Sequence, residues 1–193
     1  MHALVSVLAV AFVGQGSAKI DPNLDLVLGR RATVVALPSV QKELKATPDQ
    51  TKRLAEIFDG VVKVEGERVR VLINGDTDLP GIERDVLALL DDAQRMRLDE
   101  IWMQRCGYLA LADEQVAKKL ALTAVQSAQI VGIVHDAAKQ LADVFGPGAG
   151  TDAPAQARSV RALTDAEIAK VLTESQRRDY SALKGKPFRP GPS

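Results

Sequence analysis

The 193-residue sequence has one cysteine and two histidines, and its 25 lysines and arginines are balanced by 25 aspartates and glutamates. A single cysteine excludes an intrachain disulfide framework and every metal site built from several cysteines. Two histidines leave little for a histidine-rich metal site. The balanced charge argues against a nucleic-acid binder, because such proteins neutralise phosphates with an excess of lysine and arginine. The sequence therefore predicts no metal, no cofactor and no nucleic-acid partner.

Motifs of the common enzyme classes are also missing from the sequence. It contains no dinucleotide-binding glycine pattern after a strand, no Walker-type Gly-Lys-Ser/Thr and no Gly-x-Ser-x-Gly. Carboxylates stand side by side at Asp91-Asp92 and Asp99-Glu100. Acid–base catalysis needs two carboxylates that converge, whereas neighbours on a helix diverge, so these pairs indicate capping and solubility. We predict no catalytic residue.

Two single residues, Cys106 and His135, are candidate sites. Cys106 lacks a neighbouring base in the sequence and is interpreted as a packing residue, with an intermolecular disulfide as the alternative. His135 has no second histidine at helical spacing and is interpreted as solvated surface, with a metal site at a dimer interface as the alternative.

The N-terminus has the pattern of an export signal. Residues 3–13 form an apolar run of 11, and small residues ending in Ala18 follow it. A bilayer core requires about 20 apolar residues, so the run is too short to span a membrane. No lysine or arginine precedes the run, and a buried N-terminal helix or strand is the alternative. We expect residues 1–18 to be a signal peptide, cleaved after Ala18, for a periplasmic or secreted protein without a stable membrane span after cleavage.

A short motif occurs four times in the remaining chain. Each copy has an apolar residue, a threonine or aspartate, two variable residues and a glutamine. The threonine or aspartate can accept a hydrogen bond from the start of a helix, and the glutamine can reach back to the amide of that first residue, which together make a capping box. The predicted capping pairs are Thr47 and Gln50, Asp91 and Gln94, Thr123 and Gln126, and Thr173 and Gln176.

The apolar residues after each box favour an all-α fold, an irregular antiparallel array of long and short helices. Residues seven, ten and eleven positions after each cap are mostly apolar, which is one face of a helix. The spacing predicts a first long helix over 48–73, with a hairpin at 61–73 as the alternative because six residues there are β-branched. Further helical segments are predicted at 82–105, 113–120, 123–145, 155–172 and 173–183.

The predicted organisation has three parts after the signal peptide. Residues 19–37 are expected to form an extended arm, with a strand near 33–37 as one option. Residues 38–185 are expected to form the helical domain, with a flexible, glycine-rich break at 146–153. The proline-containing tail, 186–193, is predicted to be disordered or to lie along the surface. Lys184, Lys186 and Arg189 are interpreted as part of a solvated tail.

The repeated Leu-Thr-x-x-Gln box resembles the LTxxQ-motif superfamily of periplasmic helical proteins, which includes Spy- and CpxP-like chaperones and envelope-stress adaptors. Residues 122–126 and 172–176 match the motif outright, and residues 46–50 and 90–94 each depart from it at one position. A closer likeness, over most of 38–188, is to exported bacterial proteins with several such boxes and no assigned activity. The resemblance implies a helical fold and, by analogy with the Spy-like members, binding of unfolding clients and a homodimer.

The leading functional hypothesis is a non-enzymatic, exported protein that binds other proteins, as a Spy-like chaperone or an envelope-stress adaptor. Phe58, Met96, Trp102 and Met103 form a candidate apolar binding face, since methionine and aromatic side chains suit adaptable surfaces. Their helical spacing is more often that of a simple core. The alternatives are a structural or scaffolding envelope protein and a metal-responsive periplasmic protein.

Overall fold

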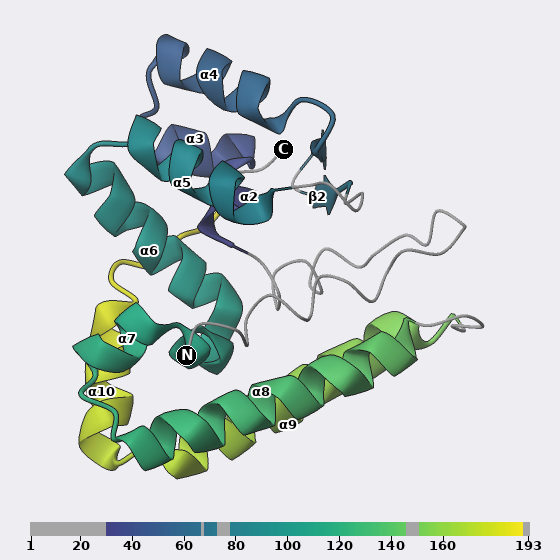
Figure 1. Ribbon diagram of the computed structural model, residues 1–193, viewed down its shortest axis with the longest axis vertical. Coiled ribbons are helices and arrows are strands. Elements are labelled where there is room, and N and C mark those ends of the chain that lie inside the picture. Colours follow the sequence, from purple (N-terminus) through teal and green to yellow (C-terminus); the bar gives the residue numbers. More distant parts are fainter. Residues whose placement is uncertain (1–29, 67, 73–77, 146–150, 191–193) are drawn as a thin grey trace.

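A computed structural model describes residues 30–66, 68–72, 78–145 and 151–190 (Figure 1). The signal peptide with its cleavage site, the arm up to residue 29, the glycine-rich segment 146–150 and residues 191–193 lie outside the described residues. The described chain is mostly helical, so the all-α prediction is confirmed. Its helices are α2 (Arg31–Val35), α3 (Pro38–Glu43), α4 (Pro48–Phe58), α5 (Leu79–Leu89), α6 (Asp92–Cys106), the 3-10 helix η1 (Gly107–Ala112), α7 (Glu114–Lys119), α8 (Ala124–Val144), α9 (Ala153–Val171) and α10 (Glu174–Leu183).

The prediction of an extended arm is wrong for residues 31–35, which form α2. Val34 and Val35 are fully buried, and Leu37 is almost so. The backbone amides that begin α2 are bonded by a glutamate of α5 rather than by a local cap. The segment therefore folds as a helix because of contacts distant in sequence, which local spacing does not reveal.

The predicted helix over 48–73 ends at Phe58, and the hairpin alternative is the one observed. Strands β1 (Val62–Glu65) and β2 (Arg68–Val71) pair antiparallel, with Val64 opposite Val69. The turn contains Gly66 at φ +62°, a conformation that residues with a side chain rarely adopt. Valines favour a strand over a helix, which accounts for the change of structure after α4.

The helical stretch predicted for 82–105 is two helices, α5 and α6, separated by an extended residue at Leu90. Asp91 begins α6, as its capping box predicts. The predicted segments at 113–120, 123–145, 155–172 and 173–183 correspond to α7, α8, α9 and α10.

The chain consists of two halves that repeat the same order of elements. A six-residue helix, α3 or α7, is followed by a residue with positive φ, Lys45 or Ala121, and then by a capping box that begins α4 or α8. A returning helix, α5 or α9, leads to the second box, which begins α6 or α10. Arg95 and Arg177 occupy the same place after that box, and each donates to two carbonyls at the end of the preceding helix.

The halves differ in the length of their central hairpins. The α8–α9 pair has helices of 21 and 19 residues, whereas α4 and α5 have 11 each and are linked through the β-hairpin. In Figure 1 α6 descends towards α7, and the α8–α9 pair extends as a long arm across the bottom of the molecule. The base of this arm packs on η1, and farther out Leu141 and Ala157 form a small cluster separate from the main core.

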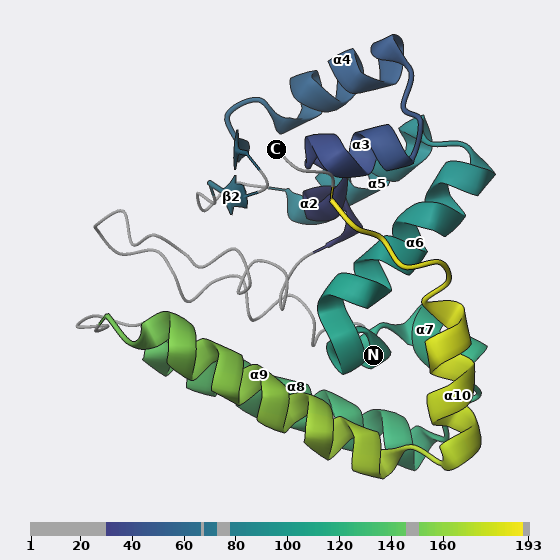
Figure 2. The ribbon, with the colours of Figure 1, turned by 180° about the vertical axis from the view of Figure 1, so that it is seen from behind.

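The C-terminal segment 186–190 lies along α6. Of the two predicted states of the tail, the surface-bound one is therefore observed for these residues. Figure 2 shows the segment leaving α10 and passing α6 on the way to α3. Gly185 stands at the bend with φ +60°, and a Cβ there would lie 2.1 Å from Cδ of Glu100. The bend therefore requires glycine.

Candidate functional site

All four predicted capping boxes are present. In each box, the side chain of the threonine or aspartate accepts a hydrogen bond from the backbone amide of the glutamine. The glutamine side chain in turn accepts one from the backbone amide of the threonine or aspartate. At Asp91 and Gln94 these two distances are 2.8 and 3.0 Å. The boxes satisfy two otherwise unpaired amides at the start of each helix.

The glutamines of the boxes also pair with one another, which the sequence did not predict. Gln50 Nε2 donates to Gln94 Oε1 at 2.8 Å, and Gln94 Nε2 donates to Gln50 Oε1 at 3.0 Å. Gln126 and Gln176 form the same reciprocal pair at 2.8 and 3.1 Å. Each half of the protein is therefore closed at its base by two side-chain amides that join the starts of two helices.

The glutamine pair uses both ends of each amide. The second N–H of Gln50 donates to the carbonyl of Leu89, and that of Gln94 donates to the carbonyl of Leu44. A primary amide offers two donors and one oxygen that can accept twice, so these contacts and the box contacts use its full capacity. Gln94 is 8% exposed, which makes this satisfaction necessary.

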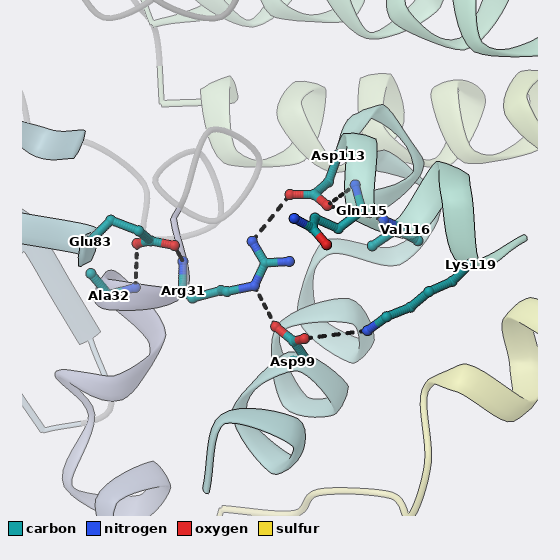
Figure 3. A network of polar contacts seen from close by, with 8 residues as sticks. All are labelled: Arg31, Ala32, Glu83, Asp99, Asp113, Gln115, Val116 and Lys119. Carbon is teal, nitrogen blue, oxygen red and sulfur yellow. Dashed lines mark hydrogen bonds and ion pairs between the residues drawn. The ribbon is translucent and has the colours of Figure 1, made fainter. Parts of the chain in front are cut away.

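A cluster of charged residues connects α2 to α6 and α7 (Figure 3). The Arg31 guanidinium donates to Asp99 and, at 3.1 Å, to Asp113, and it lies 4.2 Å from the centre of the Trp102 ring. Asp99 also lies 3.6 Å from Nζ of Lys119. The Arg31 side chain is 15% exposed. Burial by itself lowers the pKa of Arg31, but the two carboxylates more than offset this, so the net pKa is raised. Arg31 therefore stays protonated and acts as a fixed positive charge.

The carboxylates of this cluster each have a second structural role. Asp113 accepts hydrogen bonds from the amides of Gln115 and Val116 and so caps α7. Glu83 accepts hydrogen bonds from the amides of Arg31 and Ala32, at 3.1 and 2.9 Å, and so caps α2 from a distant helix (Figure 3). This arrangement of charged residues anchors helices to one another. The residues that form it lie far apart in the sequence.

Glu83 gives a pH-dependent contribution to stability. Burial raises its pKa above the ordinary value of 4.5, and the hydrogen bonds from Ala32 and Arg31 offset only part of this. Because the folded state holds the proton more tightly, this contribution is present below pH 4.5 and is lost as the pH rises through the folded-state pKa. We expect the wild type to lose stability relative to Glu83→Gln as the pH rises from 4.5 through the folded-state pKa. The quantity compared is the difference between their free energies of unfolding. Chemical denaturation from pH 4 to 8 measures it, and a flat or rising difference contradicts the assignment.

The structure places Cys106 as a packing residue. Its side chain is 3% exposed, and burial raises the pKa of the thiol to about 12, although nearby arginines, Arg161 and Arg31 foremost, lower it. A thiol with such a pKa is protonated at neutral pH and is a poor nucleophile. The neighbouring Tyr180 is also buried, and its hydroxyl donates to the carbonyl of Gly107. This corner is part of the core.

The candidate metal and acid–base residues do not converge. His135 has a side chain that is 53% exposed, and its nearest carboxylate, Asp136, is 3.9 Å away. Among the described residues, no three histidine, cysteine, aspartate or glutamate side chains are grouped to hold a metal ion. The paired carboxylates have separate partners: Asp91 caps α6 while Asp92 binds Arg95, and Asp99 binds Arg31 while Glu100 binds Arg97.

The predicted apolar binding face is wrong for three of its four residues. Phe58, Trp102 and Met103 are buried in the main core, at 7%, 7% and 2% exposure, while Met96 is 68% exposed. Phe58, Trp102 and Met103 fill the space between the helices of the first half. Met96 and Met103 do lie on one side of α6, but that side is buried at Met103 and exposed at Met96.

The described part of the chain exposes six large apolar side chains, and three of them lie on the two arm helices. Val125 and Val131 are on α8 and Leu163 is on α9, with exposures of 67%, 45% and 66%. The other three are Val64, Leu72 and Met96, on the β-hairpin, just after it and on α6.

No helix in the described ranges combines the length and the apolar character that crossing a membrane requires. Comparison of the chain with models of protein families, with curated proteins and with solved structures gave no match.

Proposed function

We propose that this is an exported, non-enzymatic helical protein of the LTxxQ-motif type that binds other proteins, as a chaperone-like holdase or an adaptor. The observation that carries the proposal is the α8–α9 arm. It packs on η1, it joins α10 through the Gln126–Gln176 pair, and it carries half of the large apolar side chains exposed in the described chain. The side of the helical pair that faces away from the core is available to a partner, and exposed apolar side chains there can contribute to binding.

The polar groups support a non-enzymatic role because their contacts are structural. The capping glutamines hold helix starts, Arg31 and Asp113 join three helices, and Glu83 caps α2. These contacts use the side chains that chemistry would otherwise need.

The arm hypothesis is tested with an aggregation assay. Wild-type protein at a severalfold molar excess is expected to suppress the light scattering of reduced insulin, and the double variant V131S/L163S is expected to need at least threefold more protein for the same effect. The matched control is V64S/M96S, which removes two exposed apolar side chains outside the arm. If wild-type protein does not suppress the scattering, the holdase role is contradicted. If both double variants lose suppression equally, the arm is not the binding site.

The adaptor version and the scaffolding alternative predict a different observation. Both require a stable, stoichiometric partner in a pull-down from envelope extracts. The scaffolding role is favoured by the wide distribution of exposed apolar residues over the β-hairpin, α6, α8 and α9. Loss of that partner in V131S/L163S, but not in V64S/M96S, assigns the contact to the arm.

Export is tested by the mass of the mature protein. We expect the exported chain to begin at Lys19, because Ala18 and Gly16 are small residues at the two positions that signal cleavage requires. Intact-mass spectrometry of the secreted or periplasmic fraction measures this. Retention of Met1 on exported protein contradicts the predicted cleavage.

The metal-responsive alternative is tested by calorimetry with zinc. Absence of a heat of binding contradicts it.

A further inference from the structure

We infer that the face of α6 bearing Arg97 and Gln104 is a recognition site for an extended peptide, filled in this chain by its own residues 186–190. A partner protein that presents an extended Lys-Pro-Phe segment would bind the same site in place of the tail. We call this face, defined by Arg97 and Gln104, the α6 peptide site. The inference goes beyond the proposed α8–α9 binding arm, since it assigns a second protein-binding site, on α6.

Gln104 binds the main chain of the tail as a neighbouring β-strand would. Its Nε2 donates to the carbonyl of Lys186 at 2.8 Å, and its Oε1 accepts from the amide of Phe188 at 2.7 Å. In an extended chain, the carbonyl of one residue and the amide two residues later point to the same side. The side-chain amide of Gln104 therefore recognises the extended main chain of the tail rather than its side chains. Recognition of an extended main chain is a common mode of peptide binding.

Arg97 supplies a second, pre-positioned donor. Its guanidinium donates to the carbonyl of Lys186 at 2.7 Å, while Glu43 of α3 and Glu100 of α6 hold it at 2.6 Å each. The Arg97 side chain is 17% exposed. A donor that is already fixed by other partners loses little conformational entropy when a peptide arrives.

The tail contributes one apolar anchor and a backbone that is already extended. Phe188 is half-buried against the main core, while Lys186 and Arg189 are exposed. Pro187 has no amide to satisfy, and it restricts Lys186, the residue before it, to extended conformations. The site therefore selects an aromatic residue after a proline and is tolerant of the charged positions around them.

The connection to α10 allows the tail to leave without unfolding a helix. Residues 186–190 form no helix or strand, and Gly185 alone provides the bend. Release of the tail breaks the contacts with Arg97, Gln104 and the core around Phe188, and none of the four capping boxes is involved. The exchange of one extended segment for another is thus confined to the α6 peptide site.

The test uses full-length protein and a fluorescein-labelled peptide with the sequence of residues 185–190. Fluorescence polarisation should show that Phe188→Ala, whose own tail has lost its anchor, binds the peptide at least tenfold more tightly than the wild type. A peptide with alanine in place of its phenylalanine should bind at least tenfold more weakly. The double variant F188A/Q104E should lose at least tenfold, because glutamate cannot donate to the carbonyl of Lys186.

Equal binding by F188A and the wild type overturns the inference, as does undiminished binding by F188A/Q104E. If F188A loses its helical circular dichroism, Phe188→Leu is used in its place, with an expected gain of about threefold because a smaller apolar anchor remains. Aggregation suppression without peptide binding overturns the α6 peptide site alone. Peptide binding without suppression or any envelope partner overturns the proposed function alone.

Discussion

Glutamate at position 94 is expected to lower the free energy of unfolding by about 2–4 kcal/mol, because it removes two hydrogen bonds and buries a charge. Within the capping box alone the change is conservative, since glutamate and glutamine serve equally well there. The pairing with Gln50 makes it severe. Glutamate has no N–H to give to Gln50 Oε1 or to the carbonyl of Leu44, and its negative charge would face both oxygens. Urea denaturation of Gln94→Glu measures the loss.

The control is Gln129→Glu, at an exposed position on α8. Its effect should stay within about 0.5 kcal/mol, as for most surface substitutions. A loss below about 1 kcal/mol in Gln94→Glu would mean that the reciprocal pair contributes little, and that the glutamines act only as helix caps.

Removal of the Arg31 guanidinium in Arg31→Met is expected to cost about 2–3 kcal/mol. Methionine keeps most of the side-chain stem, but it removes the guanidinium that lies over the Trp102 ring and leaves Asp99 and Asp113 without their shared positive partner. Asp99 and Asp113 are only 28% and 24% exposed, so water replaces the lost contacts incompletely. Thermal and urea unfolding should both show the loss.

The matched control for this variant is Arg84→Met. Arg84 pairs with Asp85 at 3.2 Å, but the two side chains are 74% and 57% exposed, and such pairs contribute about 0–1 kcal/mol. Similar losses in the two variants would show that the partial burial of the Arg31 cluster adds nothing to its strength.

The helix starts were predictable from sequence because a capping box spans only four residues. Thr123 and Gln126, for example, satisfy each other without any help from the rest of the fold. The pairing of Gln50 with Gln94 was not predictable, because these residues are 44 positions apart and meet only when two hairpins close. The same limit applies to α2, whose amides are capped by Glu83, 52 residues from Arg31.

The candidate binding face shows a second limit of sequence patterns. Met96 and Met103 are separated by two helical turns and so project from the same side of α6, yet one is 68% exposed and the other 2%. Periodicity indicates which residues share a side, whereas exposure depends on what packs along each part of the helix. For the tail the relevant signal was the glutamine at position 104, which has no local cap to serve and binds a segment 84 residues away.

The repeated halves separate the contacts that close the fold. Each glutamine pair joins residues within one half, so neither pair needs the other half in order to form. The tail is the exception, because it follows the second half in sequence and binds Arg97 and Gln104 of the first. Until the tail has bound, these two side chains are open to an extended segment of another chain.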